Sequence, residues 1–225
     1  MKLVLAGKIF KIREEIDLET IFDKTRNYRW EEEIEGGKLI KEIGKLKLES
    51  NYLEGTFFQD LPFYIKHREG MKLVIKTIEA PFLFQVDKER ILLVVLEKKR
   101  MANNIANMLS KIIFISIGSI TEAKISPETM RKFHESNPED TKVIFFDGVD
   151  IPNVDKLSLY GSQLANTNLY NEYLSRGNIW YIVFKSRKFG IIAGVTRNCV
   201  VTSFSKIEPR EFLEYIREEI FPLID

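Results

Sequence analysis

The sequence contains few of the residues that most often carry catalysis or bind metal ions. Cysteine occurs once, at Cys199, and histidine twice, at His67 and His134. A single cysteine excludes an intramolecular disulfide and fits a reducing compartment. Pro138 stands where a zincin motif that starts at His134 would need its second histidine. We therefore expect no metal site, no cofactor and no catalytic residue.

Long apolar runs and a strong net charge are also absent. No stretch approaches 18 uninterrupted apolar residues, which predicts no membrane span. The apolar run Leu3–Gly7 ends at Lys8 and is too short for a secretory leader. The formal net charge is +1, so charge alone does not mark a nucleic-acid binder. Together these absences predict a cytoplasmic protein. The scarcity of glutamine beside abundant Lys and Glu gives the composition a thermophile-like character.

The chain does contain an internal similarity between its two halves. Ile16–Thr20 aligns with Ile125–Thr129 at an offset of 109, and the pattern L-x-L-x4-L-x2-T starts at both Leu46 and Leu157. A third block of matches, at an offset of 107, pairs Gly70, Ile75, Phe82, Val94, Ile113 and Phe114 with Gly177, Ile182, Phe189, Val201, Ile220 and Phe221. Three blocks in the same order indicate duplication of a domain-sized unit. Chance matching of apolar residues is the alternative. We predict one repeat unit over residues 1–112 and a second over 113–225.

Each half is expected to read as a strand, a helix, four or five antiparallel strands and a closing helix. In the first half, the expected strands are Leu3–Ile12, a strand pair within Leu39–Leu48, Met71–Ile78, Phe82–Val86 and Ile91–Leu96, with Glu54–Glu69 as a loop or irregular edge. In the second half, they are Ile113–Ile120, Val143–Phe146, Lys156–Leu164, Ile179–Phe184, Phe189–Val195 and Cys199–Phe204. Helices are expected after Asp17, over Arg100–Ile112, after Ser126 and from Pro209. The predicted fold class is α+β, with internally duplicated β-α-β(4)-α units and helices on one face of an antiparallel sheet.

The segment Ile91–Leu96 is apolar at every position, although neighbouring side chains of a strand point to opposite faces. Both faces of this strand therefore need cover. One face would receive the helices. The other would meet the second unit, another chain or a ligand.

Two tandem β-α-β(4)-α units, each closed by a helix after a terminal hairpin, resemble the fold of the TATA-box-binding protein family. Phe82–Ile112 and Phe189–Ile220 are similar to the final hairpin and long helix of that family. The resemblance implies a continuous saddle whose apolar concave sheet enters a widened DNA minor groove.

Several basic clusters lie next to aromatic residues, a combination that suits nucleic acid because cations neutralise phosphate and rings stack or wedge. Phe63 and Tyr64 precede the cluster Lys66-His67-Arg68. The alternative is that lysine-rich turns keep sheet edges soluble and unpaired. The candidate nucleic-acid-binding residues are Lys45, Lys47, Phe57, Phe58, Lys66, Arg68, Lys185, Arg187, Lys188 and Arg197.

The sequence thus favours a non-enzymatic protein that binds DNA or RNA or has a regulatory role. A protein-interaction module that forms a homodimer through the second sheet face is the alternative. An enzyme with a pocket between sheet and helices ranks third.

Overall fold

The computed structural model describes residues 4–225, and the chain divides into two compact units. Phe10–Thr121 form one unit, which we call the arm unit. Glu122–Asp225 and the described residues up to Ile9 form the other, which we call the C-terminal unit. Strand β1 (Ala6–Ile12) begins in the C-terminal unit and ends in the arm unit. Leu3, where this strand was expected to begin, lies outside the described residues. The fold is α+β, with antiparallel strand pairing in both units.

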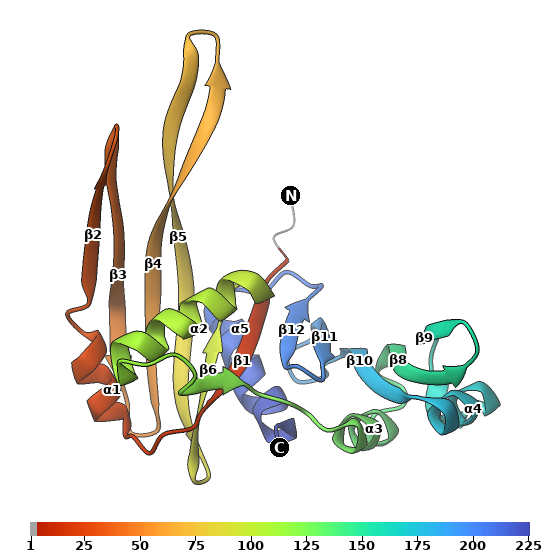
Figure 1. Ribbon diagram of the computed structural model, residues 1–225. Coiled ribbons are helices and arrows are strands. Elements are labelled where there is room, and N and C mark those ends of the chain that lie inside the picture. Colours follow the sequence, from red (N-terminus) through yellow and green to blue (C-terminus); the bar gives the residue numbers. More distant parts are fainter. Residues whose placement is uncertain (1–3) are drawn as a thin grey trace. The chain divides into compact units, whose positions relative to one another are not determined.

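The sheet of the arm unit is a meander in which each strand pairs with the next along the chain. Its order is β2 (Arg29–Ile34), β3 (Gly37–Leu48), β4 (Tyr52–His67), β5 (Gly70–Asp87) and β6 (Arg90–Val95). The pairing of β4 with β5 continues to His67 opposite Gly70, far beyond the end of β6 (Figure 1). We call the distal part of this hairpin, Leu61–Lys76, the arm.

Helices α1 (Leu18–Thr25) and α2 (Lys99–Phe114) cover one face of this sheet. The Asp17 carboxylate accepts a hydrogen bond from the backbone N–H of Thr20 at 2.6 Å, so the expected N-cap is confirmed. The apolar stripe of α2 packs against alternate residues of the sheet. The two helices and the sheet form a core that includes Ile21, Ile105, Leu109 and Ile113 from the helices and Leu53, Phe57, Phe82, Phe84, Leu93 and Val95 from the strands.

Three expectations for the arm unit were wrong. Glu54–Glu69 is not a loop, because nearly all of it belongs to β4. Its distal half is exposed on both faces, so no alternation of polar and apolar residues was required there. Met71–Ile78 and Phe82–Val86 are parts of the one strand β5, and Leu39–Leu48 lies in the one strand β3.

Residues Ile113 and Phe114 close helix α2, so the strand expected over Ile113–Ile120 was wrong as well. The helix ends at Ile115, whose backbone adopts a left-handed conformation with φ of 62°. Only the short strand β7 (Ile120–Glu122) follows. Helix α2 extends two residues beyond its expected end at Ile112, and the first of them, Ile113, is fully buried in the core.

The sheet of the C-terminal unit has a different pairing order. Its strands are β1, β12 (Val200–Ser203), β11 (Ile192–Thr196), β10 (Asn178–Lys185), β8 (Thr141–Ile151) and β9 (Val154–Tyr160), in that order. The expected strands Phe189–Val195 and Cys199–Phe204 overlap β11 and β12, which a turn at Arg197-Asn198 joins into a hairpin. Cys199 is buried in this turn and not in a strand.

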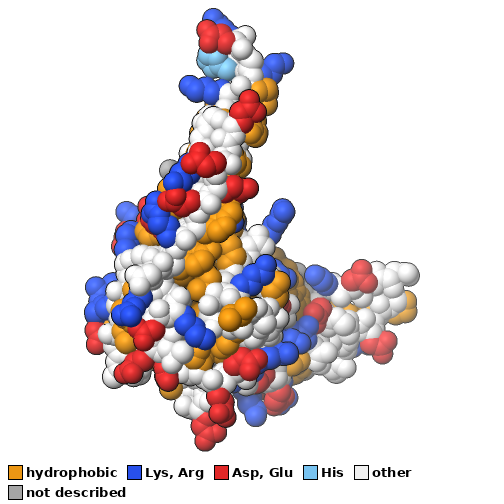
Figure 2. Space-filling view, turned by 60° about the vertical axis from the view of Figure 1, so that its left-hand side comes forward, with side chains coloured by type: hydrophobic (Ala, Val, Ile, Leu, Met, Phe, Trp, Pro, Cys, Tyr) orange, Lys and Arg blue, Asp and Glu red, His pale blue; other side chains and the backbone are white. Residues whose placement is uncertain are grey.

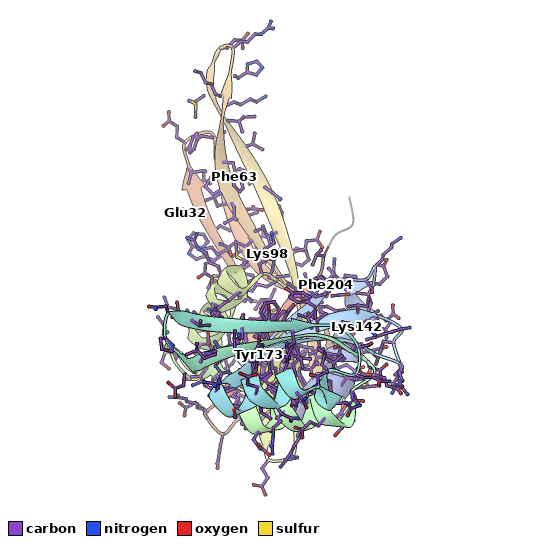
Figure 3. The ribbon with its side chains drawn as sticks, turned by 90° about the vertical axis from the view of Figure 1, so that its right-hand side faces the viewer. Glu32, Phe63, Lys98, Lys142, Tyr173 and Phe204 are labelled. Carbon is purple, nitrogen blue, oxygen red and sulfur yellow. The ribbon has the colours of Figure 1, made fainter. Side chains whose placement is uncertain are left out.

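Three helices belong to the C-terminal unit: α3 (Pro127–Ser136), α4 (Asn168–Arg176) and α5 (Pro209–Tyr215), the last continued by a π-helical turn over Ile216–Ile220. The Ser126 hydroxyl caps α3 by accepting from the Thr129 N–H, as expected. Phe133 of α3 packs against Phe184, and Tyr173 of α4 against Phe146. These contacts place α3 and α4 on one face of β8 and β10, and Figure 3 shows Tyr173 on that side.

The residues that match between the two halves of the sequence have the same secondary structure at some positions and different secondary structure at others. Asp17 and Ser126 occupy the same N-cap position of α1 and α3. Leu53 lies in strand β4, however, whereas its counterpart Leu164 lies in a short 3-10 helix before α4. In the arm unit the strands pair in chain order, so β3 lies between β2 and β4. In the C-terminal unit β10 pairs with β8 and not with β9, so β9 lies at the edge of the sheet. The C-terminal unit also has helix α4 between β9 and β10, where the strands of the arm unit follow one another without a helix, so the two units differ in element order and in strand pairing.

No helix among residues 4–225 is long and apolar enough to cross a membrane. Helix α2, the longest, has a polar face and 16 residues.

Candidate nucleic-acid interface

The arm is the most exposed apolar and basic feature of the arm unit. Phe63, Tyr64, Ile65 and Met71 have exposed fractions of 46%, 61%, 48% and 64%. Figure 2 shows hydrophobic side chains along the hairpin, with acidic side chains among them, and histidine, basic and acidic side chains at its tip. Exposure of consecutive large apolar residues is typical of an interaction surface.

Strand register assigns the arm residues to two faces. Phe63 lies opposite Val74 and Ile65 opposite Lys72, so these four side chains share one face. Tyr64, Met71, Leu73 and Ile75 lie on the other face. A Cβ atom at Gly37, the first residue of β3, would come within 2.8 Å of the Ile75 side chain. Both faces carry exposed apolar side chains, and we call the face of Phe63 and Ile65 the arm face.

Charge on the arm is strongly positive. Residues 61–76 contain four basic side chains (Lys66, Arg68, Lys72 and Lys76) and one acidic side chain (Glu69), which gives a net charge of +3. Within residues 4–225, no carboxylate forms an ion pair with any of these four basic side chains. Their charge is therefore free to act on a ligand.

The other candidates in the arm unit are placed differently. Phe57 is fully buried and stacks on Tyr28 with ring centroids 6.3 Å apart, so it cannot contact a base. Phe58 is partly exposed, and the Lys45 ammonium lies 5.1 Å from the centre of its ring. Lys45 also forms an ion pair with Glu79 at 3.1 Å.

Lys47 forms an ion pair of 2.8 Å with Glu49, and its ammonium lies 6.0 Å above the Tyr52 ring. The hydrogen bond to Glu49 is the main reason why the pKa of Lys47 is raised. Lys45 and Lys47 are thus partly neutralised by neighbouring carboxylates.

The candidates in the C-terminal unit are mostly paired with acidic residues. Arg187 contacts Asp140 at 2.6 Å and Glu139 at 3.3 Å. Lys188 forms an ion pair with Glu218, and Arg197 forms one with Asp147. Lys185 is exposed at the end of β10. Six of the ten candidates lie in the arm unit and four in the C-terminal unit, and only Lys66 and Arg68 belong to the arm.

An open cavity of about 1040 Å³ lies in the arm unit, beside the β1–α1 loop and the turns that follow β3 and β5. Its lining mixes acidic side chains such as Glu14, Glu49 and Glu89 with Arg13 and Lys88. The cavity lies at the strand ends, not between sheet and helices where an enzyme pocket was expected. Among the described residues, no group of three or more His, Cys, Asp or Glu is arranged to hold a metal ion.

His134 is a buried structural residue of the C-terminal unit. Its Nδ1 lies 2.9 Å from the Thr141 hydroxyl, and its ring packs edge-on against Tyr170. Burial lowers the pKa of His134 from 6.5 to about 4, so the ring is neutral near pH 7. Burial also raises the pKa of Tyr170, whose hydroxyl donates to Glu135 at 3.1 Å. The contacts of the imidazole with Thr141 and Tyr170 fit a packing role.

Sequence reasoning missed part of the arm. Lys72, Met71 and Val74 were assigned to an ordinary strand, and their exposure became visible only with the length of the hairpin. The available signal was the pair Lys72 and Lys76, which flank three apolar residues in the same segment.

No protein-family model matches the sequence, and a search of curated proteins finds no match.

Proposed function

We propose that the protein is a non-enzymatic DNA-binding protein that holds duplex DNA with the arm. The observation that carries the proposal is the unpaired net charge of +3 on an exposed two-stranded ribbon. Lys66, Arg68 and Lys72 would contact phosphates, and Phe63 and Ile65 would contact base edges.

The shape of the arm favours duplex DNA over duplex RNA. The major groove of B-DNA, about 12 Å wide, admits a two-stranded β-ribbon. The major groove of A-form RNA is deep and narrow, so side chains of a ribbon would not reach the bases. We therefore propose DNA as the ligand, and RNA binding is an outcome that the experiment can reveal.

The resemblance to the TATA-box-binding protein family stays a hypothesis, as does an origin by duplication. Equal capping of α1 and α3 at Asp17 and Ser126 supports duplication, whereas the different strand orders of the units count against a strict twofold relation. The proposal that the arm binds DNA does not depend on either.

The homodimer remains the second candidate, and the arm is the surface that favours it. Five large apolar side chains are exposed there, which is a feature of association surfaces as well as of surfaces that contact DNA bases. Strand β6, which suggested this reading from the sequence, does not support it, because Val94 and Val95 are both fully buried in the single chain.

The test compares two triple variants of the full chain in electrophoretic shifts with duplex DNA at low and physiological salt. Lys66→Ala/Arg68→Ala/Lys72→Ala removes charge from the arm. Lys98→Ala/Lys99→Ala/Arg100→Ala removes the same charge from exposed positions at the start of α2 in the same unit. We expect only the arm variant to weaken binding, and we expect its salt dependence to become shallower by about 2 to 3 in the slope of log K against log salt.

Equal weakening by both variants, or no binding to DNA at low salt, would overturn the proposal. If size-exclusion chromatography then shows a dimer that the change Phe63→Ala dissociates, the arm is an assembly surface.

A further inference from the structure

An aromatic cluster lies on the sheet of the C-terminal unit, on the face opposite α3 and α4. We call it the aromatic face and define it as Phe145 of β8, Tyr160 of β9, and Trp180 and Tyr181 of β10. The centroid of the Phe145 ring lies 6.0 Å from that of Tyr160, 5.9 Å from Trp180 and 5.5 Å from Tyr181. Phe145 thus joins the other three rings into one group.

Strand alternation separates this face from the helices. Phe146, the next residue after Phe145, packs against Tyr173 of α4. Phe145 lies opposite Tyr181 in the register of β8 and β10, and therefore points away from the helices. Figure 3 shows the helices on the Tyr173 side of β8 and β9.

A β-bulge brings two consecutive aromatic residues to this face. The register of β10 against β8 shifts between Ile179 and Tyr181, which leaves Trp180 as the extra residue. The bulge places both Trp180 and Tyr181 beside Phe145, although strict alternation would have sent them to opposite faces. Bulges that re-aim side chains are frequent at functional sites.

The rings are accessible and lie beside positive charge. Tyr160 is 69% exposed, and Phe145, Trp180 and Tyr181 are partly exposed. The ammonium of Lys156 lies 4.6 Å from the centre of a Trp180 ring. On the strand positions that share this face, and in the adjoining turn, the basic residues are Lys156, Lys185 and Arg197 and the acidic residue is Asp147.

From this geometry we propose that the aromatic face binds single-stranded nucleic acid by base stacking, a second activity beyond the proposed duplex binding and independent of it. Unpaired bases stack on exposed Trp, Tyr and Phe rings, and nearby cations hold the phosphates. A net charge of +2 at the face complements the polyanion and disfavours a basic or neutral partner. Paired bases keep their faces inside the helix, so the face would reject duplex.

The test is tryptophan fluorescence of the full-length Trp30→Phe variant, whose remaining tryptophan is Trp180. The probe is an oligodeoxythymidine, added at low and physiological salt. We expect quenching that saturates, with an affinity that falls as salt rises. Tyr160→Ala in the same background should weaken the affinity about tenfold, because one stacking ring is lost.

Leu169→Ala is the control, since Leu169 is an exposed apolar residue of α4, on the opposite side of the sheet, with an exposed fraction of 52%. It should leave oligodeoxythymidine binding unchanged. The idea fails if the oligonucleotide does not quench Trp180 at low salt, if Tyr160→Ala binds as tightly as its parent, or if Leu169→Ala weakens binding as much. Quenching by duplex DNA instead of the single strand would also refute it. Failure of the arm to bind duplex would leave this result intact, so the two proposals are tested separately.

Discussion

Tyr181 lies across Gly194 on the neighbouring strand so closely that no side chain could replace the glycine hydrogen. A Cβ atom at Gly194 would come within 2.7 Å of the Tyr181 Cζ and 2.8 Å of its Cε2, and closer still to the hydroxyl. A glycine inside a strand often marks a bulge or the close approach of another backbone. Its role is instead to make room for one ring of the aromatic face.

Gly194→Ala is therefore expected to displace Tyr181 and to disturb the packing next to Trp180, whose ring centroid lies 5.6 Å away. The change should shift the Trp180 emission of the Trp30→Phe protein and lower the melting temperature. In a Tyr181→Ala background, the same glycine substitution should have a much smaller effect, because the clash has been removed. Additive effects of the two substitutions would show that the ring and the glycine do not interact.

His134 should make the C-terminal unit less stable in acid. Its pKa is about 4 in the folded chain and about 6.5 when unfolded, so between these values the unfolded state binds more protons. Stability attributable to the neutral ring is fully present above pH 6.5 and is lost as pH falls toward 4, by up to about 3 kcal/mol. Urea unfolding at a series of pH values measures this dependence.

His134→Leu removes the ionisable ring from that site and should flatten the loss of stability between pH 6.5 and 4. Leu and His differ in shape, so the absolute stability at pH 7 is not the readout. The readout is the slope against pH, and an unchanged slope in the variant would assign the acid sensitivity to other groups.

Lysine substitution in strand β6 should unfold the protein, whichever face of the strand the substituted side chain occupies. Val94 and Val95 have opposite side-chain directions, and both are fully buried. Val94→Lys and Val95→Lys each place a charge in an apolar setting, which costs several kcal/mol. Val86→Lys, at a 40%-exposed position of the paired strand β5, is the control and should melt close to the unaltered protein. A folded Val94→Lys protein of altered oligomeric size would revive β6 as an assembly surface.

Alanine substitution of the two phenylalanines that were candidates for base contacts should reduce the stability of the protein by different amounts. Phe57→Ala is expected to lower the free energy of unfolding by about 3–5 kcal/mol, because it empties a site in the core. Phe58→Ala, at a partly exposed position below Lys45, should cost much less. Chemical denaturation measures the free energy of unfolding of each variant. Equal losses in the two variants would contradict the finding that Phe57 is buried in the core and Phe58 is not.

Local signals in the sequence determined much of the secondary structure. Asp17 and Ser126 cap helices because their side-chain oxygens reach a backbone N–H three residues later, an interaction that needs no distant residue. The turns Asp87–Arg90 and Thr196–Asn198 and the apolar stripe of α2 are equally local. The α+β class followed from these elements.

Signals that were weak or misleading have specific physical causes. Helix α4 was missed because its segment had been matched to strand β4 through Leu164 and Thr167. Thr167 in fact caps α4 by accepting from the Tyr170 N–H at 3.1 Å. The arm was missed because a ribbon exposed on both faces is under no pressure to alternate polar and apolar residues.

The sequence by itself determined where helices and turns form, because these depend on local hydrogen bonds. It also showed that basic and aromatic residues lie close together in the chain near Lys66 and Arg68. Only the tertiary structure decided that Phe57 is core while Phe63 is exposed, since both are phenylalanines of one strand and differ in what packs above them. The aromatic face likewise depends on register and on a bulge at Trp180, which join residues up to 36 positions apart in the sequence. Pairing between distant strands is set by the packing of the whole unit, and no local pattern specifies it.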